Sequence, residues 1–197
     1  MHCHVKTWGA IHQKSVKSTS VNSALYVLYN VLGKRRGEVN AMEKLIITAC
    51  ICGAEVTKEH NPAVPYTVEE IAKEAKSAYD AGASIIHLHV REDDGTPTQS
   101  KERFEACINA IKEVCPDVII QPSTGGAVGM SNEERLAPTT LRPEMATLDC
   151  GTCNFGGDEI FVNTENMIID FANTMNEYGI KPEIEVFDKG MVDMAIR

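Results

Sequence analysis

The sequence lacks an excess of basic residues. Its 197 residues contain 19 Lys and Arg against 28 Asp and Glu, which gives a formal net charge of −9 at pH 7. Proteins that bind nucleic acid through phosphate contacts need clustered positive charge, so the balance argues against a nucleic-acid partner. With 43% hydrophobic residues, the composition is that of a globular domain rather than of a disordered chain.

The sequence also lacks a hydrophobic run long enough to cross a bilayer. The longest apolar stretch, residues 21–32, contains three polar residues and falls short of the ~20 apolar residues that a membrane span needs. A Lys-Arg-Arg segment at residues 34–36 follows it, and no small-residue cleavage site does, so we do not interpret it as a signal peptide. We therefore expect a cytoplasmic protein with no membrane partner.

The cysteines lack the pattern of a disulfide framework. Seven are spread over the chain, which favours free thiols in a reducing compartment. Cys150 and Cys153 form a CxxC pair, but no second CxxC accompanies it, so we interpret the pair as a tight loop with two free thiols. Cys50 and Cys52 are expected to share one face of a strand, where they serve in packing.

Residues 1–41 lack the periodicity that marks the remainder of the chain. We interpret them as a non-native or disordered leader and expect translation to begin at Met42. The alternative is a genuine N-terminal extension that packs against the fold. N-terminal sequencing of the native protein distinguishes the two.

From residue 44 onward, apolar β-branched runs alternate with amphipathic segments. Thr67 and Glu70 form a capping box at the start of the first helical segment, and Gly82 follows its end. The pattern predicts strands over residues 44–52, 84–90, 117–121, 145–149 and 182–187, and helices over 67–81, 100–114, 131–136, 164–178 and from 188. This alternation indicates βαβ units and a parallel sheet, and no GxGxxG follows the first strand.

We therefore predict an α/β fold of the (β/α)8 TIM-barrel class. A complete barrel takes about 250 residues, so the barrel is expected to be incomplete here, with about five βα units. Residues 42–197 are expected to form the N-terminal portion of a catalytic domain.

The sharpest chemical signal is the pair His87 and His89. Residues i and i+2 of a strand point to the same face, so the two imidazoles should converge. Two histidines and a carboxylate can bind a catalytic divalent metal, which polarises a carbonyl group. The alternative is a pair of hydrogen-bonded interior histidines.

Other candidates follow the predicted strands, where barrel active sites form. Residues 123–126 (Ser-Thr-Gly-Gly) either present backbone N–H groups to an anion or form an ordinary loop. Glu55 either recognises a substrate ammonium group or is a solvated loop carboxylate. Arg91 either binds an anion or pairs with an acid. Glu183 and Glu185 share one strand face, and one of them could orient a catalytic group.

These segments together resemble the β-keto acid cleavage enzymes. The resemblance lies in residues 86–91 (Ile-His-Leu-His-Val-Arg), residues 121–126 (Gln-Pro-Ser-Thr-Gly-Gly), the fourth-strand segment 145–156 and the loop 53–58. It runs from about Met42 to the end of the chain. The resemblance implies a zinc-dependent barrel enzyme of lysine fermentation, which converts 3-keto-5-aminohexanoate and acetyl-CoA to 3-aminobutyryl-CoA and acetoacetate.

The resemblance also implies roles for individual residues. The metal ligands are His87 and His89, and the third ligand is a Glu expected beyond Arg197. Glu55 takes the substrate ammonium group, and a carboxylate of Glu183 or Glu185, with Glu185 preferred, sits behind the catalytic base. The remaining substrate-binding residues are Ser123, Gly126 and Thr147.

Three alternatives to this assignment remain open. A family member with another β-keto acid as substrate would not need the Glu55 carboxylate. An inactive, truncated barrel fragment would aggregate without zinc, because five strands leave sheet edges exposed. A half-barrel completed by oligomerisation would give a monodisperse, zinc-loaded species, and we expect a homo-oligomer in the full-length form. Size-exclusion chromatography with zinc analysis separates the last two.

Overall fold

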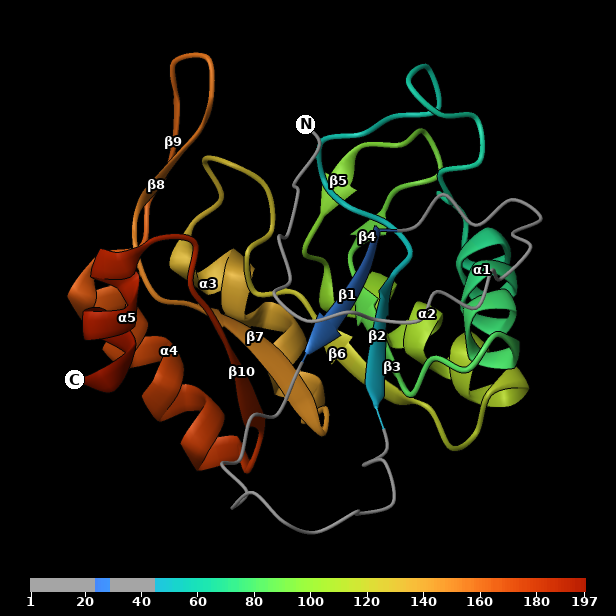
Figure 1. The fold of residues 1–197 in the computed structure, drawn as a ribbon. Helices are drawn as coiled ribbons and strands as arrows, with labels where there is room; N and C mark the ends of the chain where they lie inside the picture. Colours follow the sequence, from blue (N-terminus) through green and yellow to red (C-terminus); the bar gives the residue numbers. More distant parts are fainter. Residues whose placement is uncertain (1–23, 29–44) are drawn as a thin grey trace, which may run out of the picture.

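The structure, a computed structural model, describes residues 24–28 and 45–197, and its centre is a set of five parallel strands (Figure 1). β2 (Ile46–Cys50), β3 (Ile85–Leu88) and β6 (Ile119–Pro122) pair in parallel in that order. β7 (Met145–Asp149) pairs in parallel with β10 (Lys181–Glu185). β6 and β7 lie side by side, which places the strands in the sequential order that consecutive βα units produce.

Helices follow the strands, as the periodicity predicts. They are α1 (Val68–Asp80), α2 (Lys101–Val114), α3 (Asn132–Leu136), the 3-10 helix η1 (Ala137–Leu141), α4 (Glu165–Tyr178) and α5 (Lys189–Ile196). The predicted capping box of Thr67 and Glu70 is present at α1, and Thr164 caps α4. Gly179 ends α4 with φ of 71°, a conformation that glycine adopts without steric cost.

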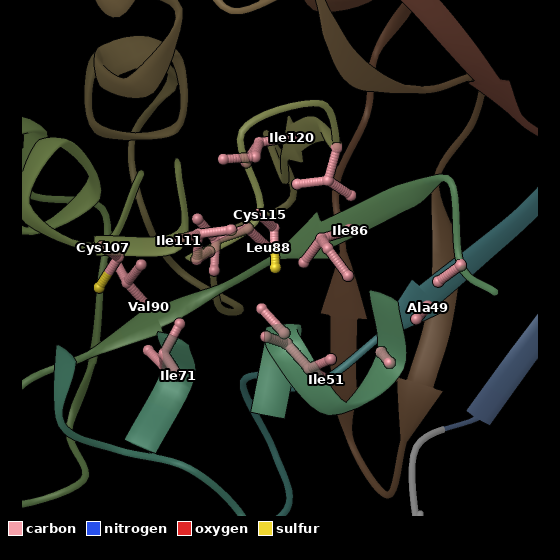
Figure 2. Packing of buried hydrophobic residues seen from close by; sticks show 14 of the residues in the cluster. Ala49, Ile51, Ile71, Ile86, Leu88, Val90, Cys107, Ile111, Cys115 and Ile120 are labelled. Atoms are coloured by element: carbon pink, nitrogen blue, oxygen red, sulfur yellow. The ribbon is translucent and has the colours of Figure 1, made fainter. Parts of the chain in front are cut away.

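The alternation of side chains along the strands separates an apolar layer from a polar one. Ile86 and Leu88 of β3 point toward α1 and α2, where they pack with Ile71 and Ile111 (Figure 2). A second apolar cluster joins β7 to α4 and includes Ala146, Leu148, Phe171 and Met175. The intervening strand residues, which carry the chemistry, therefore lie on the opposite face of the sheet.

Three short features were not expected from the sequence. β4 (Val90–Arg91) pairs with β5 (Pro97–Thr98), and β8 (Cys153–Gly156) pairs with β9 (Glu159–Phe161), so two of the loops after the strands contain antiparallel hairpins. β1 (Ala24–Leu28) pairs antiparallel with β2. β1 belongs to the segment interpreted as a leader, whose other residues lie outside the described ones, and the expected start at Met42 stays a prediction.

No helix within the described ranges is long and apolar enough to cross a membrane.

Candidate active site

The polar face of the sheet brings together side chains from neighbouring strands. His87 on β3 lies opposite Gln121 on β6 in the parallel register, and Thr147 on β7 lies opposite Glu183 on β10. A hydrogen bond from Gln121 Nε2 to Glu183 Oε2, 2.9 Å long, joins the two pairs. The residues that the sequence singled out at separate strand ends thus meet on one surface.

The two histidines converge, as predicted. Their ring centroids are 5.1 Å apart, with the rings inclined at 65°. Only His87 lies in β3, however; His89 follows the end of that strand and precedes β4, so the expectation that both occupy one continuous strand was wrong. The backbone leaves the ladder there because β4 turns into its hairpin with β5.

Burial keeps both imidazoles neutral. It lowers the pKa of His87, although the hydrogen bond to Gln121 and the charges of Glu183 and Asp149 oppose the effect. The pKa of His89 falls to about 3 because of burial, with smaller effects of His87 and of the Arg91 charge. A neutral imidazole has the lone pair that a metal ion requires, so both residues are in the ligating form at neutral pH.

This pair fits a zinc ion as two of its ligands. His87 Nδ1 lies 3.0 Å from Gln121 Oε1, so the ring nitrogen opposite, Nε2, is left for a metal. The described part of the chain contains no group of three or more His, Cys, Asp or Glu side chains arranged to hold a metal. Among these residues, His87 and His89 are therefore the two side chains that this site offers to a metal.

Asp149 and Glu185 form a carboxyl pair beside the histidines. They are register partners on β7 and β10, and burial raises the pKa of Asp149 against the opposing effects of a hydrogen bond to Glu185 and the charges of Arg135 and His87. The pKa of Glu185 is raised to about 9. Burial is the largest cause, followed by the charge and hydrogen bond of Asp149 and by the charge of Glu183. Two buried carboxyl groups in contact cannot both ionise, so the pair retains one proton at neutral pH.

This shared proton predicts a pH dependence of stability. Because the folded state raises the pKa of Glu185, its contribution is complete below the ordinary glutamate pKa and is lost as the pH rises toward about 9. We expect Asp149→Asn to lower the Glu185 pKa and to flatten the decline in the free energy of unfolding between about pH 5 and 9. Denaturant titrations at several pH values measure it. Asp158→Asn, at the exposed β8–β9 turn, is the matched control, and equal slopes for Asp149→Asn and the parent would refute the prediction.

Arg135 lies beside Asp149 of this carboxyl pair, and no sequence pattern indicated it. The guanidinium of Arg135, 3% exposed, lies 3.7 Å from Asp149 Oδ2 and donates to Thr124 O, Val162 O and Asn163 Oδ1. It also lies over the rings of Phe161 and Phe171. Local sequence patterns do not reveal this burial, because two of its hydrogen-bond partners, Val162 and Asn163, are distant in sequence.

The loop of residues 123–126 does not present the row of N–H groups that an anion site needs. The N–H groups of Ser123, Thr124 and Gly125 donate to Leu88 O, Thr147 Oγ1 and Ser123 Oγ, at 2.9–3.1 Å. The loop is instead anchored to its neighbours, with the Ser123 and Thr147 side chains buried. Gly126 has φ of 65°, and a Cβ there would lie 2.8 Å from Met130 Sδ, which explains the glycine.

Arg91 hydrogen-bonds to the backbone of the loop that carries Glu55, rather than to an anion or an acidic side chain. Its guanidinium, buried to 1% exposure, donates to the carbonyl oxygens of Gly53, Val56 and Gly95 at 2.6–3.1 Å. Glu55 itself is exposed, at the same end of the sheet as the histidines. Arg91 thereby fixes the backbone on either side of Glu55 while the carboxylate remains accessible.

The cysteines of the described ranges are all free thiols, as expected for Cys150 and Cys153. Cys50 and Cys52 do not share a strand face, because β2 ends at Cys50. Cys52 packs with Val64 and Tyr66, whereas Cys50 lies opposite His87 on the polar face. Burial, with the charges of Glu185 and Glu183, raises the pKa of Cys50 to about 12, so its thiol is neutral.

Comparison with known proteins identifies the family. The family model described as beta-keto acid cleavage enzyme matches residues 44–197. This chain belongs to the β-keto acid cleavage enzyme family. It is 81% identical over 156 residues to the 3-keto-5-aminohexanoate cleavage enzyme of Acetoanaerobium sticklandii and 82% identical over 156 residues to that of Fusobacterium nucleatum subsp. nucleatum.

These matches cover 79% of this chain and 57% of each relative. The family resemblance in the sequence is therefore confirmed, and the chain spans little more than half the length of these curated relatives. A more distant member, the 3-oxoadipate:acetyl-CoA acetyltransferase of Cupriavidus necator, is 41% identical over 151 residues, which cover 77% of this chain and 52% of that protein.

Solved structures support the fold. The apo structure of ObcA superposes with a TM-score of 0.60 at 24% identity, over 68% of this chain and 32% of that one. A binary complex of ObcA with oxaloacetate gives the same TM-score and identity, over 68% of this chain and 33% of that one. Together with the family, this likeness indicates a TIM-barrel-like α/β fold.

Proposed function

We propose that this protein is a zinc-dependent β-keto acid cleavage enzyme, which converts 3-keto-5-aminohexanoate and acetyl-CoA to 3-aminobutyryl-CoA and acetoacetate. The observation that carries the proposal is the pair of neutral, facing imidazoles of His87 and His89 beside the Asp149–Glu185 pair. The names of the two relatives at 81% and 82% identity support the substrate, and the 41% relative supports acetyl-CoA as co-substrate. The cytoplasm and lysine fermentation are the setting we propose.

In this proposal His87 and His89 hold the zinc, and a Glu outside the described residues completes the protein ligands. Zinc bound there supplies a Lewis acid for the keto group of the substrate. The neutral state of both imidazoles supports their role, because a protonated histidine cannot ligate. The partner molecules are the keto acid and acetyl-CoA, and the full-length protein is proposed to be a homo-oligomer.

We assign the substrate carboxylate to Ser123, Gly126 and Thr147. The Ser123 hydroxyl oxygen accepts from Gly125 N at 3.1 Å, and the Thr147 hydroxyl oxygen accepts from Thr124 N at 3.0 Å. A hydroxyl that accepts one hydrogen bond still has its own proton to donate. In this proposal both hydroxyls donate to the substrate carboxylate, and Gly126 belongs to the loop that borders it.

We assign the catalytic carboxyl to Glu185. Its raised pKa keeps it protonated at neutral pH, with Asp149 as the acceptor of its hydrogen bond. A carboxyl group that retains its proton can exchange it with a neighbouring base during the reaction. Glu183 has a different partner, Gln121, which argues against the same role for it.

Glu55 tests the substrate assignment. If its carboxylate binds the substrate ammonium group, Glu55→Gln removes a charge-assisted contact of about 1.5–3 kcal/mol, equivalent to roughly 10–100-fold in kcat/KM. A β-keto acid without an amino group should be turned over almost equally by the protein and the variant. Steady-state kinetics with both substrates measures the difference.

Glu59→Gln is the matched control, because Glu59 is an exposed carboxylate of the same loop. The control should behave as the parent with both substrates. Equal losses on both substrates in Glu55→Gln would instead favour the second candidate, a family member that acts on an uncharged or acidic β-keto acid. The 41% identity to a protein named for 3-oxoadipate is the observation behind that candidate.

A further inference from the structure

Gln121 is a fully buried polar residue to which the proposed function gives no role. It lies in β6 between Ile120 and Pro122, with 0% of its surface exposed. Both ends of its amide are engaged: Oε1 lies 3.0 Å from His87 Nδ1, and Nε2 donates to Glu183 Oε2 at 2.9 Å. A buried amide with both ends satisfied fixes the geometry of its partners.

In the two hydrogen bonds that link Glu183, Gln121 and His87, the donor and the acceptor of each are determined. A carboxylate can only accept hydrogen bonds, so the amide of Gln121 must turn its N–H group toward Glu183. Its carbonyl oxygen is then left for His87, and an oxygen can only accept. Nδ1 of His87 must therefore carry the proton, and Nε2 must carry the lone pair.

We propose that Gln121, oriented by Glu183, is a positioning residue that fixes His87 in the Nδ1–H tautomer and presents the Nε2 lone pair to a divalent metal. The tautomer follows from these two hydrogen bonds alone, whereas its use for metal binding rests on the proposed function. A ligand histidine held by a hydrogen bond from its second nitrogen binds metal more tightly, because neither ring rotation nor a change of tautomer opposes binding.

The proposal separates the two glutamates of β10. Glu183 acts on His87 through Gln121, which lies two strands from Glu183. Glu185 instead pairs with Asp149 on the adjacent strand. Both side chains lie on the same face because they are two residues apart. The sequence therefore could not distinguish them, and their partners do.

The tautomer can be read directly in the metal-free 197-residue chain. Long-range ¹H–¹⁵N correlation spectra distinguish a protonated from an unprotonated ring nitrogen of each histidine. We expect Nδ1 of His87 to be protonated in the parent. In Gln121→Leu we expect a mixture dominated by the Nε2–H form, which an unconstrained imidazole favours, with a native-like backbone spectrum as the check on folding.

Exchange of the amide and the carboxylate between positions 121 and 183 gives a sharper test, because Gln and Glu have nearly the same volume. Glu183→Gln replaces the acceptor-only group, so the Gln121 amide can turn over and His87 should show both tautomers. In the double variant Gln121→Glu/Glu183→Gln, the carboxylate at position 121 accepts from both neighbours, and the Nδ1–H tautomer should return. A residue with a merely structural role would not show this rescue.

Metal affinity provides the second measurement. Zinc chloride is titrated against a chromophoric chelator, with the parent and each variant. Loss of such a supporting hydrogen bond weakens metal binding by about 10–100-fold. We therefore expect Gln121→Leu and Glu183→Gln to bind zinc more weakly than the parent by that factor, and the double variant to bind it nearly as tightly as the parent. Glu144→Gln is the control, because Glu144 is exposed and its ion pair with Lys112, 3.7 Å long, lies at the surface.

The two readouts separate failure of this inference from failure of the proposed function. An Nε2–H tautomer in the parent, or an unchanged tautomer in Gln121→Leu, overturns the inference whatever the zinc result. The Nδ1–H tautomer in a parent that binds no zinc supports the positioning of His87 and refutes its use for zinc binding by the 197-residue chain. Weaker zinc binding in Glu144→Gln equal to that in Glu183→Gln would also overturn the inference.

Discussion

Replacement of Arg135 by methionine is expected to lower the free energy of unfolding by about 3–5 kcal/mol, because removal of one member of a buried ion pair leaves the other uncompensated. Arg135 lies 3.7 Å from Asp149 Oδ2, and both side chains are almost fully buried. Its guanidinium also supplies hydrogen bonds to Thr124 O and Val162 O, which would be left without that donor. Chemical denaturation followed by far-UV circular dichroism measures the change.

Arg197→Met is the matched control. Arg197 pairs with Glu165 at 3.4 Å, but the two side chains are 60% and 50% exposed. A solvent-exposed ion pair contributes about 0–1 kcal/mol, so the control should unfold almost as the parent does. Similar losses in the two variants would mean that Arg135 does not stabilise the carboxyl pair.

The largest functional effect is expected for His87→Ala and His89→Ala. If these imidazoles hold the metal, either substitution should lower kcat by roughly a thousandfold, because several kcal/mol of Lewis-acid stabilisation are lost and each 1.36 kcal/mol is tenfold in rate. Bound zinc should fall in parallel. Metal analysis of the purified protein and steady-state assays with the amino keto acid and acetyl-CoA measure both quantities.

His60→Ala is the histidine control for this experiment. His60 is exposed, and its Nδ1 lies 2.9 Å from Thr57 Oγ1 within the loop after β2. It should retain zinc and activity. Full zinc occupancy in His87→Ala and His89→Ala would contradict the proposed metal site, even if activity were lost.

The sequence predicted most of the repeating units because their signals are local. The strand over residues 145–149 has the bounds of β7, and the helix cap at Thr67 lies where the capping-box pattern placed it. These features depend on residues within one turn or one strand. Family membership of the segments around His87 and residues 121–126 is likewise confirmed.

What the sequence could not supply depends on distant contacts. The sequence suggested an anion or an acid as the partner of Arg91 and did not single out Arg135. Both side chains are buried by contacts with residues far along the chain. The hairpins β4–β5 and β8–β9 have only two to four residues in each strand, too few for a period to be detected. For Gln121 the sequence did contain a usable signal, because an amide inside an apolar strand is buried and needs a hydrogen-bond partner. The roles of the individual site residues remain predictions.

Arg91 holds the loop after β2 in a way that bears on how the family diversifies. Its hydrogen bonds to the segment around position 55 are to the main-chain oxygens of Gly53 and Val56. Side chains in the loop can therefore be exchanged while the anchor stays intact. A single base change at the codon for position 55 could then alter which substrate the protein prefers without loss of the fold, so that new specificities arise in one mutational step.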